Sequence, residues 1–500
     1  GLVGSEMCIR DRISFALSLL ALIAGYFLYG RFVERVFAPD NRVTPAVSKS
    51  DGVDFIALPN WKVFMIQFLN IAGTGPIFGA IMGAKFGPSA YLWIVLGCIF
   101  AGSVHDYLSG MLSMRNDGAS LPQLTGKYLG MTTKKVMLVF TVLLLIMVGT
   151  VFVYSPAEIL HTIGGSSVMW IIIIFAYYVI ATMLPIDKII GKIYPLFALS
   201  LLFMAFALMI VLFVKMPDVP ELWDGLGNMG MQTDPAWTDG IFPCLFITIA
   251  CGAVSGFHAT QSPLMARCIK SEKMGRPIFY GAMITEGTVA LIWATVSSYF
   301  FYGSPAPGYQ LIEAARESGF HTSAPAVVNI ICNDWLGVAG GILALLGVVA
   351  APITSGDTAF RSARLIIAEF LGLDQRPIRR RLYICLPLFA LSIAMLLWQM
   401  ENPDGFNTIW QYFGWANQTL AVFTFWTLTV YLSREGKPYV ITLVPALFMT
   451  VICTTYLFVS RQAFHLPEPL AYTLGGVVLL IAVCWFAVWH RKYCKNKLKH

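Results

Sequence analysis

Ionisable side chains interrupt three otherwise apolar stretches of this sequence. His105 and Asp106 stand in the first stretch, His258 in the second and Glu286 in the third. An ionisable group at membrane depth is costly, and it usually faces a cavity, a partner or a proton path. We therefore predict that these four residues carry a coupled proton. The alternatives are helix packing for Asp106 and a structural hydrogen bond between helices for Glu286. His258 has no second histidine or cysteine at metal spacing, so we predict no metal site.

Small residues break two apolar stretches, which read NIAGTGPIFGAIMG (70–83) and IACGAVSGFHATQS (249–262). Glycine lowers helix stability by about 1 kcal/mol and proline by about 3 kcal/mol. Within lipid, the freed backbone groups must be satisfied by protein or by a water-filled cavity. We predict that both breaks are unwound segments that line a substrate cavity, with packed kinks as the alternative. The predicted substrate-binding residues here are Asn70, Gly73, Thr74, Gly75, Gly252, Ser255 and Gly256.

Two further polar groups fall in later apolar stretches. Asn417 and Gln418, in FGWANQTLA, could bind a peptide bond or a carboxylate, or could hold helices together. Thr354, Ser355 and Asp357, in APITSGDTAFRSAR, offer oxygen ligands for a sodium ion. The alternative for this second group is that it unwinds and caps the end of a helix.

The composition requires a membrane protein with many spans. Of the 500 residues, 57% are hydrophobic and 12% are charged, and the mean hydropathy is +0.71. Soluble proteins carry about 25% charged residues. The ten cysteines contain no CxxC pair, which gives no sign of a disulfide framework or a zinc site. The net charge of +7 is no nucleic-acid signature, and its distribution along the chain is more informative.

A membrane-spanning helix needs about 20 mostly apolar residues. On that basis the sequence predicts an all-α protein with thirteen spans, at 13–33, 61–83, 89–112, 136–156, 167–185, 193–214, 240–260, 277–302, 335–356, 382–400, 406–432, 439–459 and 470–490. Most of the 34 basic residues then fall in loops on the same side as the C-terminus. The positive-inside rule therefore places the N-terminus outside and the C-terminus in the cytoplasm.

The two breaks suggest an inverted repeat. The spans of 61–214 and 240–432 form two sets of five with opposite orientation, and each set begins with an interrupted segment. Paired interruptions of this kind indicate a transporter binding site. The remaining parts are an extra helix and linker at 13–60, and two helices with a basic tail at 439–500. Residues 1–12 share no periodicity with the apolar stretch that begins at residue 13, and we expect them to be a non-native leader.

Several motifs closely resemble the carbon starvation protein A (CstA) family, namely GTGPIFGA, AGSVHDYLSG, FITIACGAVSGFHA, GDTAFRSAR and IWQYFGWANQTLA. The resemblance implies an inner-membrane transporter with a leucine-transporter-like core, which imports small peptides or pyruvate during nutrient starvation and is driven by protons. Longer family members carry a His-His pair where this chain has Ile66 and Gln67, so the chain resembles the shorter branch. The family motifs include the positions Gly73 to Pro76, His105, Asp106, Gly252 to His258, Glu286, Asp357, Asn417 and Gln418.

The leading hypothesis is a proton-coupled importer of small peptides that works by alternating access. The alternative is a symporter of pyruvate or another small carboxylate, coupled to protons or sodium. A starvation sensor and a passive channel are weaker hypotheses. The sequence shows no HExxH and no GxSxG elbow, so we predict no enzyme. The expected partners are the substrate and the lipid bilayer, with no nucleic acid and no cofactor beyond the coupling ion; the sequence gives no oligomeric state.

Overall fold

The computed structural model describes residues 13–183, 190–215, 217–227, 240–302, 324–375, 377–402 and 405–497. Within these ranges all regular structure is helical, as predicted. The expected leader at 1–12 lies outside the described residues. The α-helices are α2 (Ile13–Phe27), α3 (Tyr29–Phe37), α4 (Pro45–Ser48), α5 (Asn60–Ala72), α6 (Ala80–Gly83), α7 (Ser89–Gly97), α8 (Ser103–Arg115), α9 (Leu121–Leu129), α10 (Met131–Ile163), α11 (Ser167–Met183), α12 (Ile190–Lys215), α14 (Ile241–Thr248), α15 (His258–Ala266), α16 (Gly281–Tyr302), α18 (Ala324–Leu371), α19 (Ile378–Glu401), α20 (Gly405–Arg434), α21 (Val440–Val459) and α22 (Glu468–Lys497).

Short π-helical turns continue three of these helices. They are η1 (Gly75–Gly79), η3 (Cys98–Gly102) and η6 (Arg276–Tyr280). Single π-turns inside α-helices are rare and often mark functional sites. Here η1 follows the first break, η3 leads into α8, and η6 leads into α16. All three therefore lie on the elements that carry the candidate residues.

By length and composition, eight helices in the described part of the chain could cross a membrane, or nine with one bent pair. The bent pair joins Asn60–Ala72 to Gly75–Phe86 at an angle of 49°. These are fewer than the thirteen spans that the sequence suggested. The other four predicted segments correspond to α11, which is short, to the broken pair α14 and α15, and to α18 and α20, which carry polar site residues.

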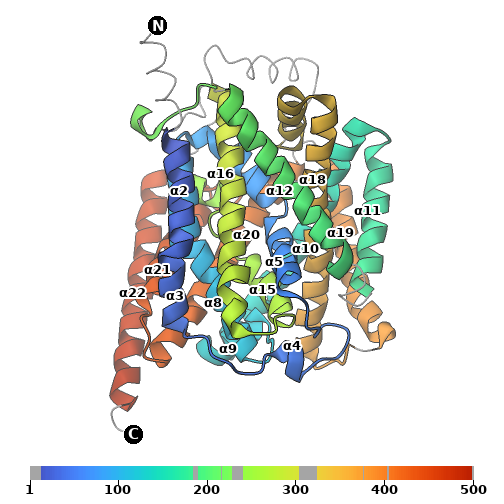
Figure 1. The fold of residues 1–500 in the computed structure, drawn as a ribbon. Coiled ribbons are helices and arrows are strands. Elements are labelled where there is room, and N and C mark those ends of the chain that lie inside the picture. Colours follow the sequence, from blue (N-terminus) through green and yellow to red (C-terminus); the bar gives the residue numbers. More distant parts are fainter. Residues whose placement is uncertain are drawn as a thin grey trace.

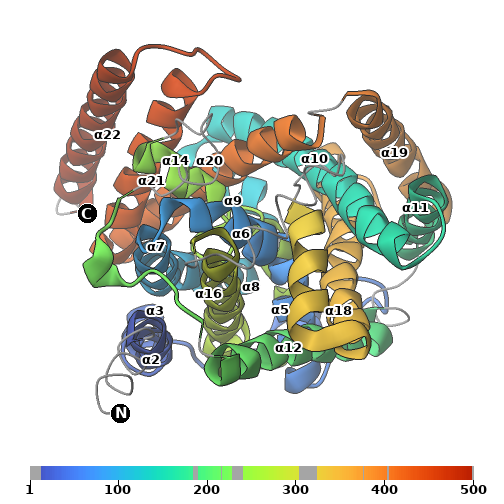
Figure 2. The same ribbon diagram turned by 90° about the horizontal axis from the view of Figure 1, so that it is seen from above.

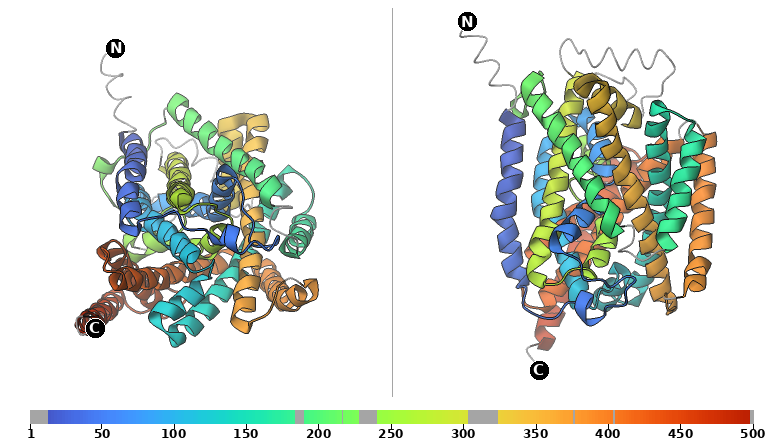
Figure 3. Two further views of the ribbon diagram at one scale, coloured as in Figure 1. Left: turned by 60° about the horizontal axis from the view of Figure 1, so that its bottom comes forward. Right: turned by 45° about the vertical axis from the view of Figure 1, so that its right-hand side comes forward.

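The peripheral helices surround a centre built from the broken ones. Figure 2 shows α2, α11, α19 and α22 at the edge, around α5, α6, α8 and α16. The first described helix begins at one end of the bundle, and the last ends at the other (Figure 1). This placement agrees with an odd number of crossings. We call the end where α22 finishes the C-terminal end. The short helix α4 and the chain after it run across this end (Figure 3).

Basic loops that are far apart in the sequence meet at the C-terminal end. Arg115 Nη2 lies 3.0 Å from Glu272 Oε2. Lys437 Nζ donates to the carbonyl of Phe37 at 2.6 Å. The sequence placed all of these loops on one side of the membrane, and the fold brings them into direct contact.

Candidate functional site

Both predicted helix breaks are present. The α5 helix ends at Ala72, and Gly73 then adopts φ +36° before η1 begins at Gly75. The second break separates α14 from α15, and Gly252 within it has φ +90°. Positive φ favours glycine because glycine has no Cβ. The glycines therefore allow the two helices to unwind at these points.

The two unwound segments pack directly on each other. A Cβ added at Gly75 would overlap the side chain of Cys251, and one at Gly79 would lie 2.9 Å from the carbonyl oxygen of Thr248. On the other side of the second break, a Cβ at Gly256 would overlap the carbonyl oxygen of Asn417. Small residues thus let three backbone segments approach closely, as is usual between membrane helices.

Four buried side chains form a connected group beside the second break. We call His105, Asp106, His258 and Glu286 the acid–imidazole cluster. His105 Nδ1 lies 2.8 Å from Asp106 Oδ1, and His258 Nδ1 lies 2.9 Å from Asp106 Oδ2. His258 Nε2 lies 3.4 Å from Glu286 Oε2. All four residues have no exposed surface. The residues that the sequence selected from α8, α15 and α16 therefore meet at one place.

The contacts give the two carboxyl groups different surroundings. Each oxygen of Asp106 accepts a hydrogen bond from a different histidine, so this carboxylate is held in place. Both oxygens of Glu286 lack a hydrogen-bond partner among the described residues, and they face His258 Nε2. If Nδ1 of His258 donates to Asp106, then Nε2 can accept a proton from Glu286. The geometry thus allows a proton to move between Glu286 and His258.

Cys251 also approaches this cluster. Ligand atoms of Cys251, His258 and Glu286 all lie within 4.8 Å of one another, a closeness that the sequence did not indicate. The thiol is hydrogen-bonded within the break, however, because it donates to Ser255 Oγ at 3.5 Å and accepts from Asn417 Nδ2 at 3.7 Å. The two remaining ligands are fewer than the three or four protein ligands of zinc sites. We therefore assign no metal ion to this group.

A line of polar side chains approaches the first break along α5. Gln67 and Asn70 are three residues apart on α5, so they share one face of that helix, and Thr74 follows in the break itself. All three are fully buried, and their amide and hydroxyl groups have no hydrogen-bond partner among the described residues. Buried polar groups are nearly always bonded to protein or water. This face therefore suits a polar ligand or ordered water.

Asn417 supports the second break. Its Oδ1 accepts from the backbone N–H of Phe257 at 2.6 Å, and its Nδ2 donates to Ser255 Oγ at 3.1 Å. The neighbouring Gln418 donates to the carbonyl of Phe246 at 2.7 Å. These contacts favour the helix-holding alternative for Asn417 over direct substrate binding. Gln418 Oε1 is buried and has no hydrogen-bond partner among the described residues, so this amide keeps both alternatives.

The three predicted sodium ligands have separate partners. Ser355 Oγ lies 3.0 Å from the carbonyl oxygens of both Leu69 and Asn70, at the end of α5. Thr354 Oγ instead donates to the carbonyl of Ala351 in its own helix at 2.8 Å. Asp357 Oδ2 accepts from Tyr177 Oη at 2.8 Å. Only Ser355 therefore contacts the first broken helix through its side chain.

Sequence reasoning missed a buried ion pair near the C-terminal end. Asp54 Oδ1 lies 3.4 Å from Arg361 Nη1 and 3.5 Å from Arg364 Nη2, and its side chain is 7% exposed. Burial raises the pKa of Asp54, but the charges of Arg364 and Arg361 outweigh burial and hold this pKa below its ordinary value. The partners are about 300 residues apart, and no local pattern reveals such a pair.

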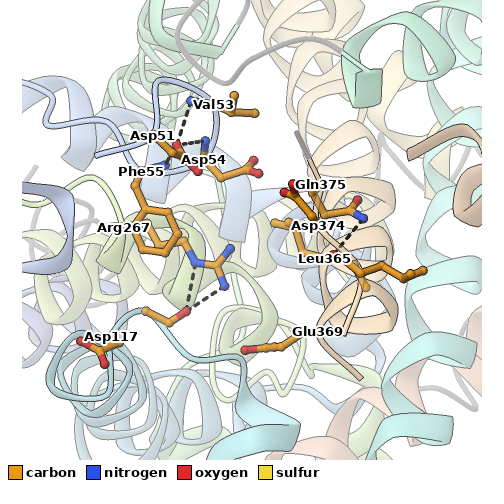
Figure 4. Close-up of a pocket in the computed structure, with 13 residues that line it drawn as sticks. Asp51, Val53, Asp54, Phe55, Asp117, Arg267, Leu365, Glu369, Asp374 and Gln375 are labelled. Carbon is orange, nitrogen blue, oxygen red and sulfur yellow. Dashed lines mark hydrogen bonds between the residues drawn. The ribbon is translucent and has the colours of Figure 1, made fainter. Parts of the chain in front are cut away.

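A cavity of about 350 Å³, which Asp54 also lines, opens beside this ion pair between the ends of several elements. Figure 4 shows Arg267 within it, where Nε and Nη2 donate to the carbonyl of Gly118 at 2.9 and 2.8 Å. The cavity lies between the segment before α5, the turn after α15 and the end of α18. Its carboxyl side chains are Asp51, Asp54, Asp117, Glu369 and Asp374.

The comparison with known families gives a clear match. The family described as "Carbon starvation protein CstA" matches residues 13–162, 152–317 and 309–456. The chain belongs to this family, which is a family of transporters and not of enzymes.

Relatives of two kinds are similar to the chain. An "Uncharacterized membrane protein" of Haemophilus influenzae is 46% identical over 341 residues, which cover 57% of this chain and 91% of the relative. The "Peptide transporter CstA" of Campylobacter jejuni is 28% identical over 541 residues, which cover 85% of this chain and 77% of the relative.

Two solved structures share the fold at low sequence identity. A manganese transporter of Eremococcus coleocola has a TM-score of 0.55 and 12% identity, with 90% of this chain and 99% of that one covered. A Na+-coupled sialic acid symporter in a substrate-bound outward-open state has a TM-score of 0.54 and 16% identity, with 92% and 96% covered. The chain is thus a multi-span membrane protein whose fold is that of leucine-transporter-like transporters.

Proposed function

We propose that this member of the CstA family imports small peptides by proton-coupled alternating access across the cytoplasmic membrane during nutrient starvation. The relatives named peptide transporters support the substrate class. The likeness to a symporter supports secondary transport. The observation that carries the proposal is the acid–imidazole cluster, which is fully buried and joined through His258 to the start of α15, directly after the second break.

We further propose the topology that the sequence suggested. The chain crosses the membrane thirteen times, with inverted repeats at 61–214 and 240–432, the N-terminus outside and the C-terminus inside. The start of α2 and the end of α22 lie at opposite ends of the bundle, which supports an odd number of crossings (Figure 1). The meeting of the basic loops supports a cytoplasmic C-terminal end. Under this topology, the cavity of Figure 4 faces the cytoplasm.

The substrate lies between the two breaks in this proposal. Gln67, Asn70 and Thr74 bring neutral donors and acceptors to the first break, and these suit the amide group of a peptide. The partial positive charge at the start of α15 suits the peptide's carboxylate. Pyruvate would use the carboxylate site but has no amide group for this face. The neutral polar face therefore favours a peptide over pyruvate.

Glu286 is the proton carrier in this proposal, and Asp106 positions His258. When Glu286 is protonated, it can donate to His258 Nε2, and this contact ties α16 to α15. Loss of that proton makes Glu286 a buried carboxylate that requires a new partner, such as a charged imidazole. Protonation thus changes the interactions between the second broken helix and α16, which is the requirement for coupling.

Transport by purified protein in liposomes tests the role of Glu286. We expect Glu286→Gln to lower uptake of labelled dialanine driven by an inward proton gradient at least tenfold. Exchange of labelled for unlabelled dialanine without a gradient should be retained, because glutamine imitates the protonated acid. The matched control is Glu158→Gln, which changes a partly buried carboxyl group of α10 outside the cluster. Gradient-driven uptake that survives in Glu286→Gln would remove Glu286 from the mechanism.

The same liposomes distinguish the substrate classes. Labelled dialanine and labelled pyruvate are compared under an identical proton gradient, with and without a protonophore. Uptake of dialanine that the protonophore abolishes is the expected result. Uptake of pyruvate alone would replace the peptide by a small carboxylate.

Sodium coupling is the second candidate, and one contact favours it. Ser355 Oγ and the carbonyl oxygens of Leu69 and Asn70 bring three oxygen atoms together where α5 unwinds. Hard cations such as sodium are bound by oxygen atoms of this kind. A sodium gradient at equal pH on both sides should then drive uptake in the wild type but not in Ser355→Ala. Uptake that ignores sodium would exclude this candidate.

A further inference from the structure

An aromatic groove lies between α20 and α22, and its lining includes no residue of the acid–imidazole cluster or of the two helix breaks. Its volume is about 360 Å³. The α22 helix stands at the edge of the bundle, beside α21 (Figure 2). The side of the groove formed by α20 and α22 is almost entirely apolar, and its lining residues there are Val422, Phe423, Trp426, Val430, Ala482, Trp485, Phe486 and Trp489.

The length of the groove suits one acyl chain. Its lining covers residues 422–430 of α20 and 482–489 of α22. At 1.5 Å per residue, each wall is about 12 Å long. One leaflet contributes about 15 Å of hydrocarbon, half of the bilayer core. Trp485 is 76% exposed, so this wall also faces the lipid side of the bundle.

Cations surround the end of the groove that is closer to the C-terminal end. Tyr128 closes the groove there, and Arg434 lies beside it, with Nη2 3.2 Å from the Tyr128 carbonyl oxygen. The Nε atom of Arg434 is buried and has no hydrogen-bond partner among the described residues. Lys127 Nζ lies 5.7 Å from the centre of the Tyr128 ring. Lys492 is exposed and follows Trp489 by three residues, so it lies on the same face of α22.

One carboxyl group accompanies these cations. Glu435 is exposed and directly follows Arg434. The positive charges therefore outnumber the negative one around the mouth of the groove. An apolar slot with a cationic mouth, at the depth of one leaflet, matches a lipid that has a negative headgroup.

We propose that this groove binds an anionic phospholipid of the leaflet at the C-terminal end. The acyl chain lies between Trp426 and Trp485, and the headgroup phosphate contacts Arg434 and Lys492. Charge complementarity favours this ligand over a second copy of the chain, whose apolar helix would leave the cations without partners. The site is separate from the acid–imidazole cluster, and the proposal does not depend on the transported substrate.

Lipid retention in native mass spectrometry tests the proposal. Purified protein in detergent is mixed with phosphatidylglycerol or with phosphatidylcholine of the same acyl chains. We expect phosphatidylglycerol to be retained more strongly, and Lys492→Gln to weaken its retention about fivefold, since each surface cation contributes a factor of this size. Adding Arg434→Gln should weaken retention further. The matched control is Arg379→Gln with Arg380→Gln, which removes exposed cations at the start of α19.

A second variant examines the apolar part. Trp489→Ala should reduce retention of both lipids, because it removes part of the apolar lining of the groove and leaves the cations at its mouth in place. Lys492 and Trp489 lie on the peripheral helix α22, so we expect both variants to fold. An unchanged thermal unfolding midpoint checks this. Equal retention of the two lipids in the wild type, or equal losses in Lys492→Gln and in the α19 control, would overturn the proposal.

Discussion

The ion pairs of Asp54 connect the chain before the first broken helix to α18. Asp54 precedes α5 by six residues, while Arg361 and Arg364 lie on α18. Nearby, the backbone N–H of Leu58 donates to the carbonyl of Cys268 at 3.1 Å, after α15. Both broken helices are therefore held at this end. We predict that Asp54→Asn opens the C-terminal end of the bundle.

The size of the effect follows from burial and distance. Removing one partner of a buried ion pair costs about 3–5 kcal/mol. The N–O distances of 3.4 and 3.5 Å are longer than those of strong charged hydrogen bonds, which are about 2.7–2.9 Å. The adjoining cavity also brings water close to the pair. We therefore expect a loss of about 2 kcal/mol, which shifts the balance between closed and open states by about 30-fold.

Thiol labelling measures this opening. Thr260 lies on α15 and is 4% exposed, and the carbonyl of this residue accepts from Ser362 Oγ of α18 at 3.1 Å. A Thr260→Cys protein, with the exposed Cys484 and Cys494 replaced by serine, is treated with a membrane-impermeant thiol reagent from the C-terminal side. We expect Asp54→Asn to increase the labelling rate at least tenfold.

The control for this experiment lies in the same cavity. Asp117 also lines it, but its side chain is 72% exposed and pairs with Lys49 at the surface. An exposed pair contributes less than about 1 kcal/mol. Asp117→Asn should therefore leave the labelling rate near that of the parent. If Asp54→Asn labels no faster than Asp117→Asn, the ion pairs do not hold this end closed.

The pH dependence of this pair has a defined sign. The pKa of folded Asp54 lies below its ordinary value of 3.8, so the ion pairs contribute stability above about pH 4 and lose it as the pH falls through the lowered pKa. The wild type should thus exceed Asp54→Asn in thermal midpoint by a constant amount from pH 7 to pH 5, and the difference should shrink in stronger acid. A difference that grows on acidification would contradict this assignment.

Two further variants examine the second break. Gly256→Ala places a methyl group against the carbonyl oxygen of Asn417, and such overpacking destabilises a fold by about 1–3 kcal/mol. We therefore expect a lower thermal unfolding midpoint and lower uptake. The control is Gly476→Ala, whose added methyl group meets no atom within 4 Å and should change neither quantity. Asn417→Ala leaves the N–H of Phe257 buried without its acceptor, at a cost of about 1–3 kcal/mol. Thr424→Ala is its control, because that hydroxyl donates to the carbonyl of Leu420 in its own helix at 2.9 Å, and equal effects would refute the bracing role.

The sequence predicted those features that have local signals. Glycine and proline mark a helix break within a few residues, so the breaks at Gly73 and Gly252 could be predicted. A buried ionisable residue is equally visible in an apolar stretch, which identified all four members of the acid–imidazole cluster. Their contacts were not visible, because His258 and Asp106 are 152 residues apart.

Features that depend on long-range packing could not be predicted. The sequence suggested Asp357 as a sodium ligand, yet its carboxylate bonds to Tyr177, on α11. Asp54 stands in a polar loop and looks like an ordinary surface acid until α18 packs over it. Length and apolarity recognise eight or nine of the thirteen predicted spans among the described residues. The α11 helix is too short for this criterion, and polar residues such as Asn417 and Gln418 lower the apolar character of α20.

The two carboxyl groups of the cluster illustrate how the structure adds to the sequence. Asp106 and Glu286 were equal candidates for the coupled proton. In the fold, both oxygens of Asp106 already have a histidine Nδ1 as hydrogen-bond partner. Glu286 is held less firmly, since the ion pair that its Oε2 forms with His258 Nε2 has the longer distance of 3.4 Å. The proton that moves during transport should therefore belong to Glu286, while Asp106 keeps His258 oriented through the cycle.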